Sequence, residues 1–190
     1  MTTETDDEGV AYSYCNGATG GSGPAGTEAL ELIDPESVIS FVDESSASGY
    51  YFPATQLQEL TGVDPISGLS NALFAGGHPQ SVQAVYDGDA VVGVSFNDAR
   101  SALADEFPDV GEKVVVFAYT SNIPNDGVVV SGDLSDEVQQ MITDALLAVA
   151  ETEEGAAALA AVYEIDGLDP ANLDAFENVV RPVEANFGDA

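Results

Sequence analysis

The chain has 190 residues, of which 45% are hydrophobic, so it carries enough apolar material for a buried core. It contains 34 Asp and Glu residues against 3 Lys and Arg residues, which gives a formal net charge of -31 at pH 7. A surface this negative repels the phosphates of nucleic acids and anionic lipids, so both are excluded as partners.

The acidic residues are dispersed among apolar stretches such as Val114–Phe117, unlike the acids of a disordered tail. In dilute salt these charges repel one another, whereas at molar ionic strength the Debye length falls to about 3 Å and the repulsion is screened. The composition therefore predicts a halophilic protein. The alternative is a mesophilic protein with a cation-binding face, which the dispersion of the acids disfavours.

Residues 1–34 are acidic and then glycine-rich, which predicts a flexible leader. Cys15 is the single cysteine, so the chain has neither an internal disulfide framework nor a multi-cysteine zinc site. The polar stretch Met1–Tyr14 is neither a signal peptide nor a lipobox, and no segment approaches the roughly 20 apolar residues of a membrane span.

The first firm element is a strand at Ser37–Asp43, and a helix is predicted at Tyr50–Thr61 because Pro53 suits its first turn and Gly62 its end. Strands and helices then alternate in the order Leu73–Phe74 (strand), Pro79–Tyr86 (helix), Ala90–Phe96 (strand), Asp98–Phe107 (helix, capped by Asn97) and Lys113–Tyr119 (strand). This alternation predicts a mainly parallel sheet with crossover helices on its faces and a ligand site at the carboxyl ends of its strands.

The remaining residues predict a strand at Val128–Ser131, a long amphipathic helix at Ser135–Thr152 and a short helix at Ala156–Tyr163. The broad apolar face of the long helix must be buried against another surface. A second copy of the chain, a separately encoded lobe or a rearranged core are the three alternatives.

Small polar residues follow three of the predicted strands and open the next helix, at Ser45–Ser48, Gly76–His78 and Asn97–Asp98. Free backbone N–H groups and the positive end of the helix dipole attract an oxyanion at such a position without any Lys or Arg. From the residues alone, helix capping by the serines and a structural role for His78 remain open alternatives.

Three segments together resemble one family: Ser45–Pro53 (SSASGYYFP), Phe74–His78 (FAGGH) and Tyr119–Asp126 (YTSNIPND). From about Pro35 to Val183 the chain is similar to the phosphonate-type periplasmic binding proteins, the solute-binding components of ABC importers. The resemblance implies an α/β fold of the periplasmic-binding-protein type II kind. It would have a complete three-layer lobe at residues 35–126 and a C-terminal helical segment at 127–190 that completes part of the second lobe.

The same resemblance implies capture of a small phosphorus oxyanion, namely phosphonate, phosphate or phosphite, without catalysis and without a cofactor. The partner would be an ABC transporter permease, and the full-length protein would lie outside the cytoplasm at the cell surface. Much of the family's first lobe has no counterpart here, although Tyr12 and Tyr14 are candidates for a remnant. Self-association or a separate first lobe is therefore expected.

The resemblance also implies a set of ligand-binding residues. The serines would hold the oxyanion with nearby amides, the histidine would donate to it, and the aspartates would accept from a protonated oxygen or an amino group of the ligand. These residues are Ser45, Ser46, Ser48, His78, Asp98 and Asp126. Taken without the family, Asp126 reads as a turn residue of Pro124–Gly127.

Two other functions compete with solute binding. An enzyme would combine His78 with Asp98, Asp126 or a serine, but the chain has no Gly-x-Ser-x-Gly elbow, no second histidine for a metal site and no phosphate-binding loop with lysine. A truncated lobe without ligand affinity, acting as an interaction fragment, is the second alternative.

The acidic composition leads to a first prediction. Circular dichroism in dilute buffer and in multimolar KCl is expected to show folded protein only at high salt, because screening removes the repulsion among carboxylates. Full folding in dilute buffer would contradict the halophilic interpretation.

Overall fold

The computed structural model describes residues 1–18, 25–34, 36–64, 67–69, 71–163 and 165–187. The chain forms two compact units, one of residues 1–124 with 177–190 and one of residues 125–176. The division differs from the predicted segments, because the leader and the C-terminal end join the same unit as the predicted lobe.

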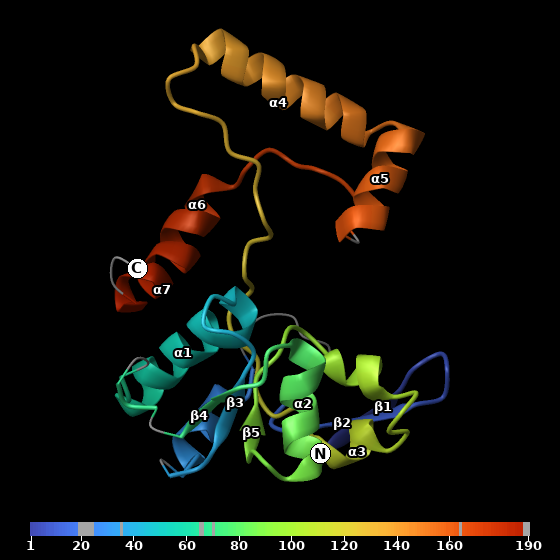
Figure 1. The fold of residues 1–190 in the computed structure, drawn as a ribbon, viewed down its shortest axis with the longest axis vertical. Coiled ribbons are helices and arrows are strands. Elements are labelled where there is room, and N and C mark those ends of the chain that lie inside the picture. The colour runs from blue at the N-terminus through green and yellow to red at the C-terminus, as the bar shows by residue number, and fades with distance from the viewer. Residues whose placement is uncertain (19–24, 35, 65–66, 70, 164, 188–190) are drawn as a thin grey trace. The chain divides into compact units, whose positions relative to one another are not determined.

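A three-stranded parallel sheet forms the centre of the larger unit (Figure 1). Strand β3 (Ile39–Phe41) lies between β4 (Ala72–Phe74) and β5 (Val92–Gly93) and pairs in parallel with both. Helix α1 (Phe52–Thr61) connects β3 to β4, and α2 (His78–Asp87) connects β4 to β5. The predicted parallel sheet with crossover helices is confirmed, since parallel neighbours require such connections.

The central strand alternates its side chains between two helices. Ile39 and Phe41 pack against Tyr50, Ala54 and Leu57 at and before α1. On the other face, the Ser81 hydroxyl of α2 donates to the carbonyl of Ser40 (2.9 Å) and accepts from the amide of Val94 (3.2 Å). Because side chains of a strand alternate with period two, one helix covers each face, and the predicted three-layer α/β lobe is confirmed.

Glycines end both crossover helices, as predicted for the first of them at Gly62. Gly62 (φ 73°) follows α1 and Gly88 (φ 84°) follows α2, and both adopt the left-handed conformation that costs glycine least. The first turn of the predicted helix at Tyr50–Thr61 differs, because a π-helical turn, η2 (Ala47–Tyr51), precedes α1.

The structure corrects three predicted elements after α2. The strand expected at Ala90–Phe96 is reduced to β5, and the helix expected from Asp98 to Phe107 is the short 3₁₀ helix η3 (Ala99–Leu103), which Asp98 caps in place of Asn97. The strand expected at Lys113–Tyr119 begins instead as the helical turn α3 (Val110–Lys113) and continues with isolated bridges at Val116 and Tyr119. Tertiary packing overrides strand propensity here, since Val110 is buried in a cluster with η3 and α2.

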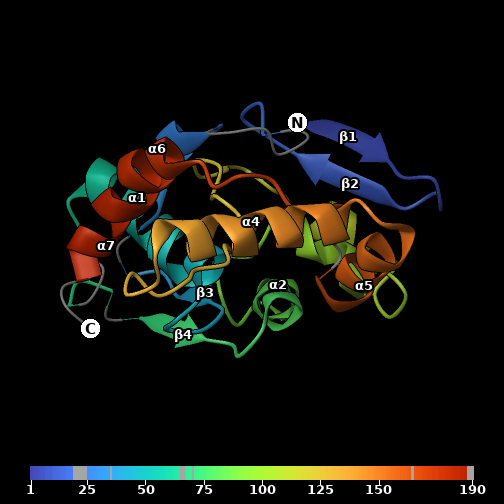
Figure 2. The ribbon, with the colours of Figure 1, turned by 90° about the horizontal axis from the view of Figure 1, so that it is seen from above.

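Part of the leader predicted to be flexible forms a β-hairpin, labelled β1 and β2 in Figure 2. Strands β1 (Thr2–Thr5) and β2 (Ala11–Tyr14) are antiparallel, and the 3₁₀ helix η1 (Thr27–Leu32) follows. Strand β2 lies so close to α3 that a side chain on Gly111 would come within 2.2 Å of the carbonyl oxygen of Ala11. Tyr12 and Tyr14, noted as candidate remnants, are both buried in this packing.

Arg100 joins the hairpin to the rest of the lobe and is 1% exposed. Its Nη1 donates to the carbonyl oxygens of Ser13 (2.8 Å), Gly111 (3.1 Å) and Val114 (2.7 Å), and its Nε donates to Oδ1 of Asp98 (2.7 Å). Burial disfavours the charged guanidinium, but the bonds to Asp98 outweigh this effect and raise the pKa of Arg100.

The smaller unit is helical. It contains α4 (Asp136–Ala150), which lies within the predicted helix Ser135–Thr152 and has Ser135 as its N-cap, together with α5 (Glu153–Tyr163) and the short α6 (Leu173–Ala175). The strand predicted at Val128–Ser131 is wrong, since these residues are irregular and Val129 is 91% exposed. Met141 and Val149 of α4 are also exposed.

The chain then returns to the larger unit through the π-helical turn η4 (Phe176–Val180) and α7 (Arg181–Phe187). The ring of Phe187 contacts those of Tyr50 and Tyr51, with centroids 5.3 and 4.7 Å apart. The C-terminal end therefore extends the aromatic cluster beside the sheet.

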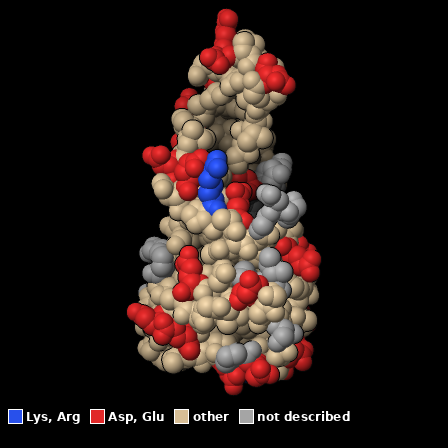
Figure 3. Space-filling view, turned by 90° about the vertical axis from the view of Figure 1, so that its left-hand side faces the viewer, with Lys and Arg blue, Asp and Glu red and all other residues tan. Residues whose placement is uncertain are grey.

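Carboxylates are distributed over the surface in separate groups, as the face in Figure 3 shows. The three basic residues are all paired with acids: Arg100 with Asp98, Lys113 with Asp109, and Arg181 with Glu177. Only the Arg100 pair is largely buried, with 1% of the Arg100 side chain and 22% of the Asp98 side chain exposed, whereas the side chains of the other four residues are 49–68% exposed.

The burial of Arg100 generates the second prediction. Arg100→Met is expected to lower the free energy of unfolding by about 3–5 kcal/mol, because it leaves Asp98 without its counter-charge and three carbonyls without their donor. Arg181→Met, which breaks an exposed pair, is the matched control and is expected to change stability little. Urea unfolding in molar salt measures both, and equal effects would contradict the structural role of Arg100.

Candidate functional site

The three parallel strands end at one edge of the sheet, called the carboxyl edge below. The segment after β4 is bonded to the end of β3, because the amides of Ala75 and Gly76 donate to the carbonyls of Phe41 (2.9 Å) and Val42 (2.8 Å). Since β3 lies between its two neighbours, Ser45–Ser48 follow the middle strand, with Gly76–His78 and Asn97–Asp98 on the flanking ones. The structure thus places all three predicted segments at the carboxyl edge.

In the serine loop after β3 (Ser45–Ser48), one hydroxyl is already hydrogen-bonded within the protein. The Ser45 hydroxyl donates to Oδ1 of Asp43 (2.6 Å), and this bond with the Ser45 amide lowers the pKa of Asp43. The Ser46 oxygen accepts from the amide of Gly49 (3.0 Å), which leaves its own proton available. Ser46 is therefore better placed than Ser45 to donate to a ligand, and among the described residues none is hydrogen-bonded to the hydroxyl of Ser48.

The backbone of this loop also offers donors. Ser46 is the N-cap of η2, which continues into α1, so the amides of Ala47 and Ser48 belong to a first turn that has no preceding carbonyls to bond. Gly49 permits this arrangement, because a side chain there would come within 2.4 Å of Cβ of Val42. The loop therefore lies directly against the end of β3.

His78 is the first residue of α2 and contacts the segment after β5. Its Nδ1 accepts from the amide of Phe96 (2.8 Å), and the two rings lie 4.7 Å apart. Burial lowers the pKa of His78, so the imidazole is neutral near pH 7 and carries its proton on Nε2. A neutral Nε2–H donor at a helix start suits an oxyanion.

Asp98 has partners of its own. Arg100 contacts both carboxylate oxygens, and the hydroxyl of Tyr14 donates to Oδ2 (3.0 Å). Burial, followed by the nearby Asp98 charge, raises the pKa of Tyr14 to about 12, so this hydroxyl stays protonated. Sequence reasoning missed the part that Arg100 takes here, although a base two residues after an acid in so acidic a chain is a signal for such a pair.

Asp126 lies in the smaller unit and is exposed. The serines, His78 and Asp98 follow strands that end at the carboxyl edge of the sheet. The ligand-binding role of Asp126 stays a prediction.

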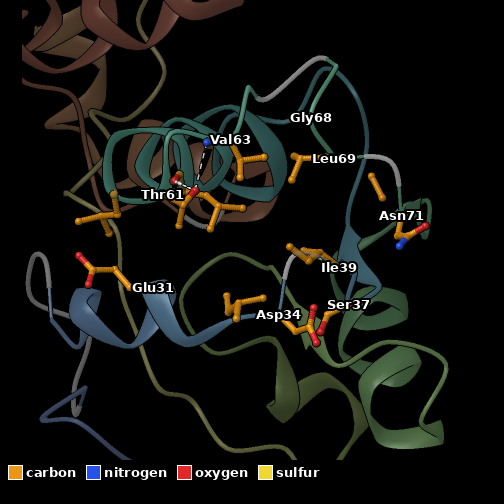
Figure 4. A pocket seen from close by; sticks show the side chains of 13 residues that line it. Glu31, Asp34, Ser37, Ile39, Thr61, Val63, Gly68, Leu69 and Asn71 are labelled. Carbon is orange, nitrogen blue, oxygen red and sulfur yellow. Dashed lines mark hydrogen bonds between the residues drawn. The ribbon is translucent and has the colours of Figure 1, made fainter.

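A pocket of about 480 Å³ opens at the opposite edge of the sheet, where β3 and β4 begin (Figure 4). Its described lining combines apolar side chains such as Leu57 and Leu69 with the acids Glu31 and Asp34, and includes no basic residue. Its carboxylates make it unsuitable for an oxyanion, and sequence reasoning did not find it, since it arises from η1 packing beside α1.

Comparison with known proteins decides the family. The model of a family described as "ABC transporter, phosphonate, periplasmic substrate-binding protein" matches residues 20–176. The chain belongs to this family.

The fold agrees with that assignment. The chain is similar to the crystal structure of a binding protein component of an ABC phosphonate transporter from Pseudomonas aeruginosa, with a TM-score of 0.56 and 19% sequence identity. The match covers 95% of this chain and 59% of the solved one, as expected for one complete lobe and part of another. No curated protein matches the sequence.

Two further findings concern the described residues alone. They contain no helix long and apolar enough to cross a membrane, and no cluster of three or more His, Cys, Asp or Glu side chains arranged to hold a metal ion.

The environment of His78 generates the third prediction. Its folded pKa lies below the unfolded value of 6.5, so its contribution to stability is fully present above that pH and is lost as the pH falls through the folded pKa. An NMR titration of this single histidine is expected to give a midpoint below 6.5 and, at higher pH, a proton on Nε2. A midpoint above 6.5 would contradict the contact with Phe96.

Proposed function

We propose that this chain is the solute-binding component of an ABC importer and captures a small phosphorus oxyanion (phosphonate, phosphate or phosphite) without chemical conversion. The observation that carries the proposal is the set of neutral donors at the carboxyl edge. They are the hydroxyls of Ser46 and Ser48, the first-turn amides beside them and Nε2–H of His78. Oriented donors of this kind stabilise an oxyanion without a counter-charge.

Neutral hydrogen-bond donors are the groups that this chain has available for binding an anion. All three of its basic residues are already paired with acids, so recruiting one for the ligand would break an existing ion pair. In a protein with a net charge of -31, a local group of donors lets an anion bind against a repulsive field.

The geometry disfavours an enzyme. In a catalytic triad the histidine is oriented by a carboxylate and faces a nucleophile. Here Nδ1 of His78 accepts from the Phe96 amide, and Asp98 is bonded to Arg100 and Tyr14. We therefore assign His78 to ligand binding.

The family assignment extends the proposal to the partner and the location. The partner is the permease of the same ABC transporter, and the site of action lies outside the cytoplasm, at the cell surface. A lobe without ligand affinity is the second candidate, favoured by the match to only 59% of the related chain, since the opposing lobe contributes to closure on a ligand in such proteins.

The fourth prediction tests the donors by calorimetry with phosphate, phosphite and methylphosphonate in molar KCl. Ser48→Ala is expected to weaken binding roughly tenfold or more, because a hydrogen bond to a charged acceptor contributes about 1.5–3 kcal/mol. Ser45→Ala is the matched control with a small expected effect, since its proton is bonded to Asp43.

Ser46→Ala is expected to affect stability as well as affinity. Its oxygen caps η2, so its removal is expected to cost about 1 kcal/mol of stability in addition to affinity. If none of the three oxyanions binds to folded wild-type protein, the proposed function is wrong and the second candidate stands.

A further inference from the structure

The carboxylate of Asp98 receives four hydrogen bonds. Oδ1 accepts from Nε of Arg100 (2.7 Å) and from the Arg100 amide (3.3 Å). Oδ2 accepts from Nη2 of Arg100 (2.5 Å) and from the hydroxyl of Tyr14 (3.0 Å). A carboxylate has about four lone-pair sites, so the acceptor capacity of Asp98 is filled by its own protein.

The donors to Asp98 are themselves held in place. The remaining guanidinium nitrogen, Nη1, donates to three backbone carbonyls in β2, α3 and the residue after α3. The guanidinium also stacks near the rings of Tyr12 and Tyr14, at 5.1 and 4.7 Å from their centroids. Neither Arg100 nor Tyr14 is free to turn away and release an oxygen of Asp98.

A ligand that donated to Asp98 would have to displace one of these donors. Displacing Arg100 would leave a charge unpaired at a position that is 1% exposed, which is costly. Displacing Tyr14 would break a hydrogen bond that joins the hairpin to Asp98, between residues 84 positions apart in the chain.

We propose that Asp98 is a positioning residue which ties the N-terminal hairpin to the carboxyl edge, and that the site takes phosphorus oxyanions without an amino group. This inference rests on the proposed function and narrows its ligand class. An acidic side chain at this position would otherwise select a ligand that carries an ammonium group, because an ionised carboxylate acts only as an acceptor. Once its lone pairs are filled, it has no acceptor left for such a group.

The test compares two ligands of nearly equal size, 2-aminoethylphosphonate and n-propylphosphonate, which differ in a terminal ammonium against a methyl group. Calorimetry in molar KCl gives the affinity ratio for the wild-type protein. The expected result is that the amino ligand binds no tighter than the propyl ligand. An amino ligand that binds tenfold tighter would overturn the inference on the wild-type protein alone, whether or not any variant folds.

Asp98→Asn separates positioning from direct contact. The substitution is expected to weaken both ligands together, with their ratio within threefold of the wild-type value, because it acts through the hairpin and not through the terminal group. A selective tenfold loss of the amino ligand would show that Asp98 contacts the ammonium group and would overturn the inference.

The chain supplies a matched control for this variant. Asp109 has the same kinds of partner at the surface, since it accepts from the hydroxyl of Tyr86 (2.7 Å) and from Nζ of Lys113 (2.9 Å). Asp109→Asn is expected to change neither affinity. If the wild-type protein binds none of phosphate, phosphite and the two phosphonates, the proposed function fails. A tenfold preference for the amino ligand, by contrast, overturns only the inferred ligand class.

Discussion

The largely buried ion pair of Arg100 and Asp98 is the interaction that holds the N-terminal hairpin, η3 and α3 together in the larger unit. In a chain with 3 basic and 34 acidic residues, it is the one ion pair whose basic member is fully buried. Burial of a charge is tolerated only when the charge is neutralised and its hydrogen-bonding groups are satisfied. Arg100 meets that condition because it donates to Asp98, the N-cap of η3, to Ser13 of β2 and to Gly111 of α3. These bonds hold the three segments together.

The same pair bears on the proposed anion site of this strongly acidic protein. Its arginine is committed to structure, so under the proposed function the attraction for an oxyanion comes from dipoles at the carboxyl edge. Helix starts after β3 and β4 supply amides, and the sequence places serine hydroxyls and a histidine on the same turns. Such groups carry no formal charge that concentrated salt would screen, which is consistent with the expected saline setting.

The smaller unit, residues 125–176, contains no Lys or Arg and so supplies no base for an ion pair of this kind. Helix α4 begins at a good cap and has regular apolar spacing, yet Met141 and Val149 remain exposed. Helix formation needs only local signals, whereas burial of an apolar face needs a surface contributed from elsewhere. The match to 59% of a related binding protein agrees with a chain that contains one complete lobe and part of another.

Local chemistry let the sequence determine the helix ends at Gly62 and Gly88, the cap at Ser135 and the alternation that produces a parallel three-layer lobe. Parallel pairing alone then brings the serine loop, His78 and Asp98 to one edge. Only the tertiary structure decided that residues 2–14 form a hairpin, that Lys113–Tyr119 is not a strand, and that Ser45 and Asp98 are hydrogen-bonded to other residues of the protein. The physical reason is distance along the chain. The hydrogen bond between Tyr14 and Asp98 joins residues 84 positions apart, and it depends on the packing of β2 and α3 around Arg100, which no local sequence pattern encodes.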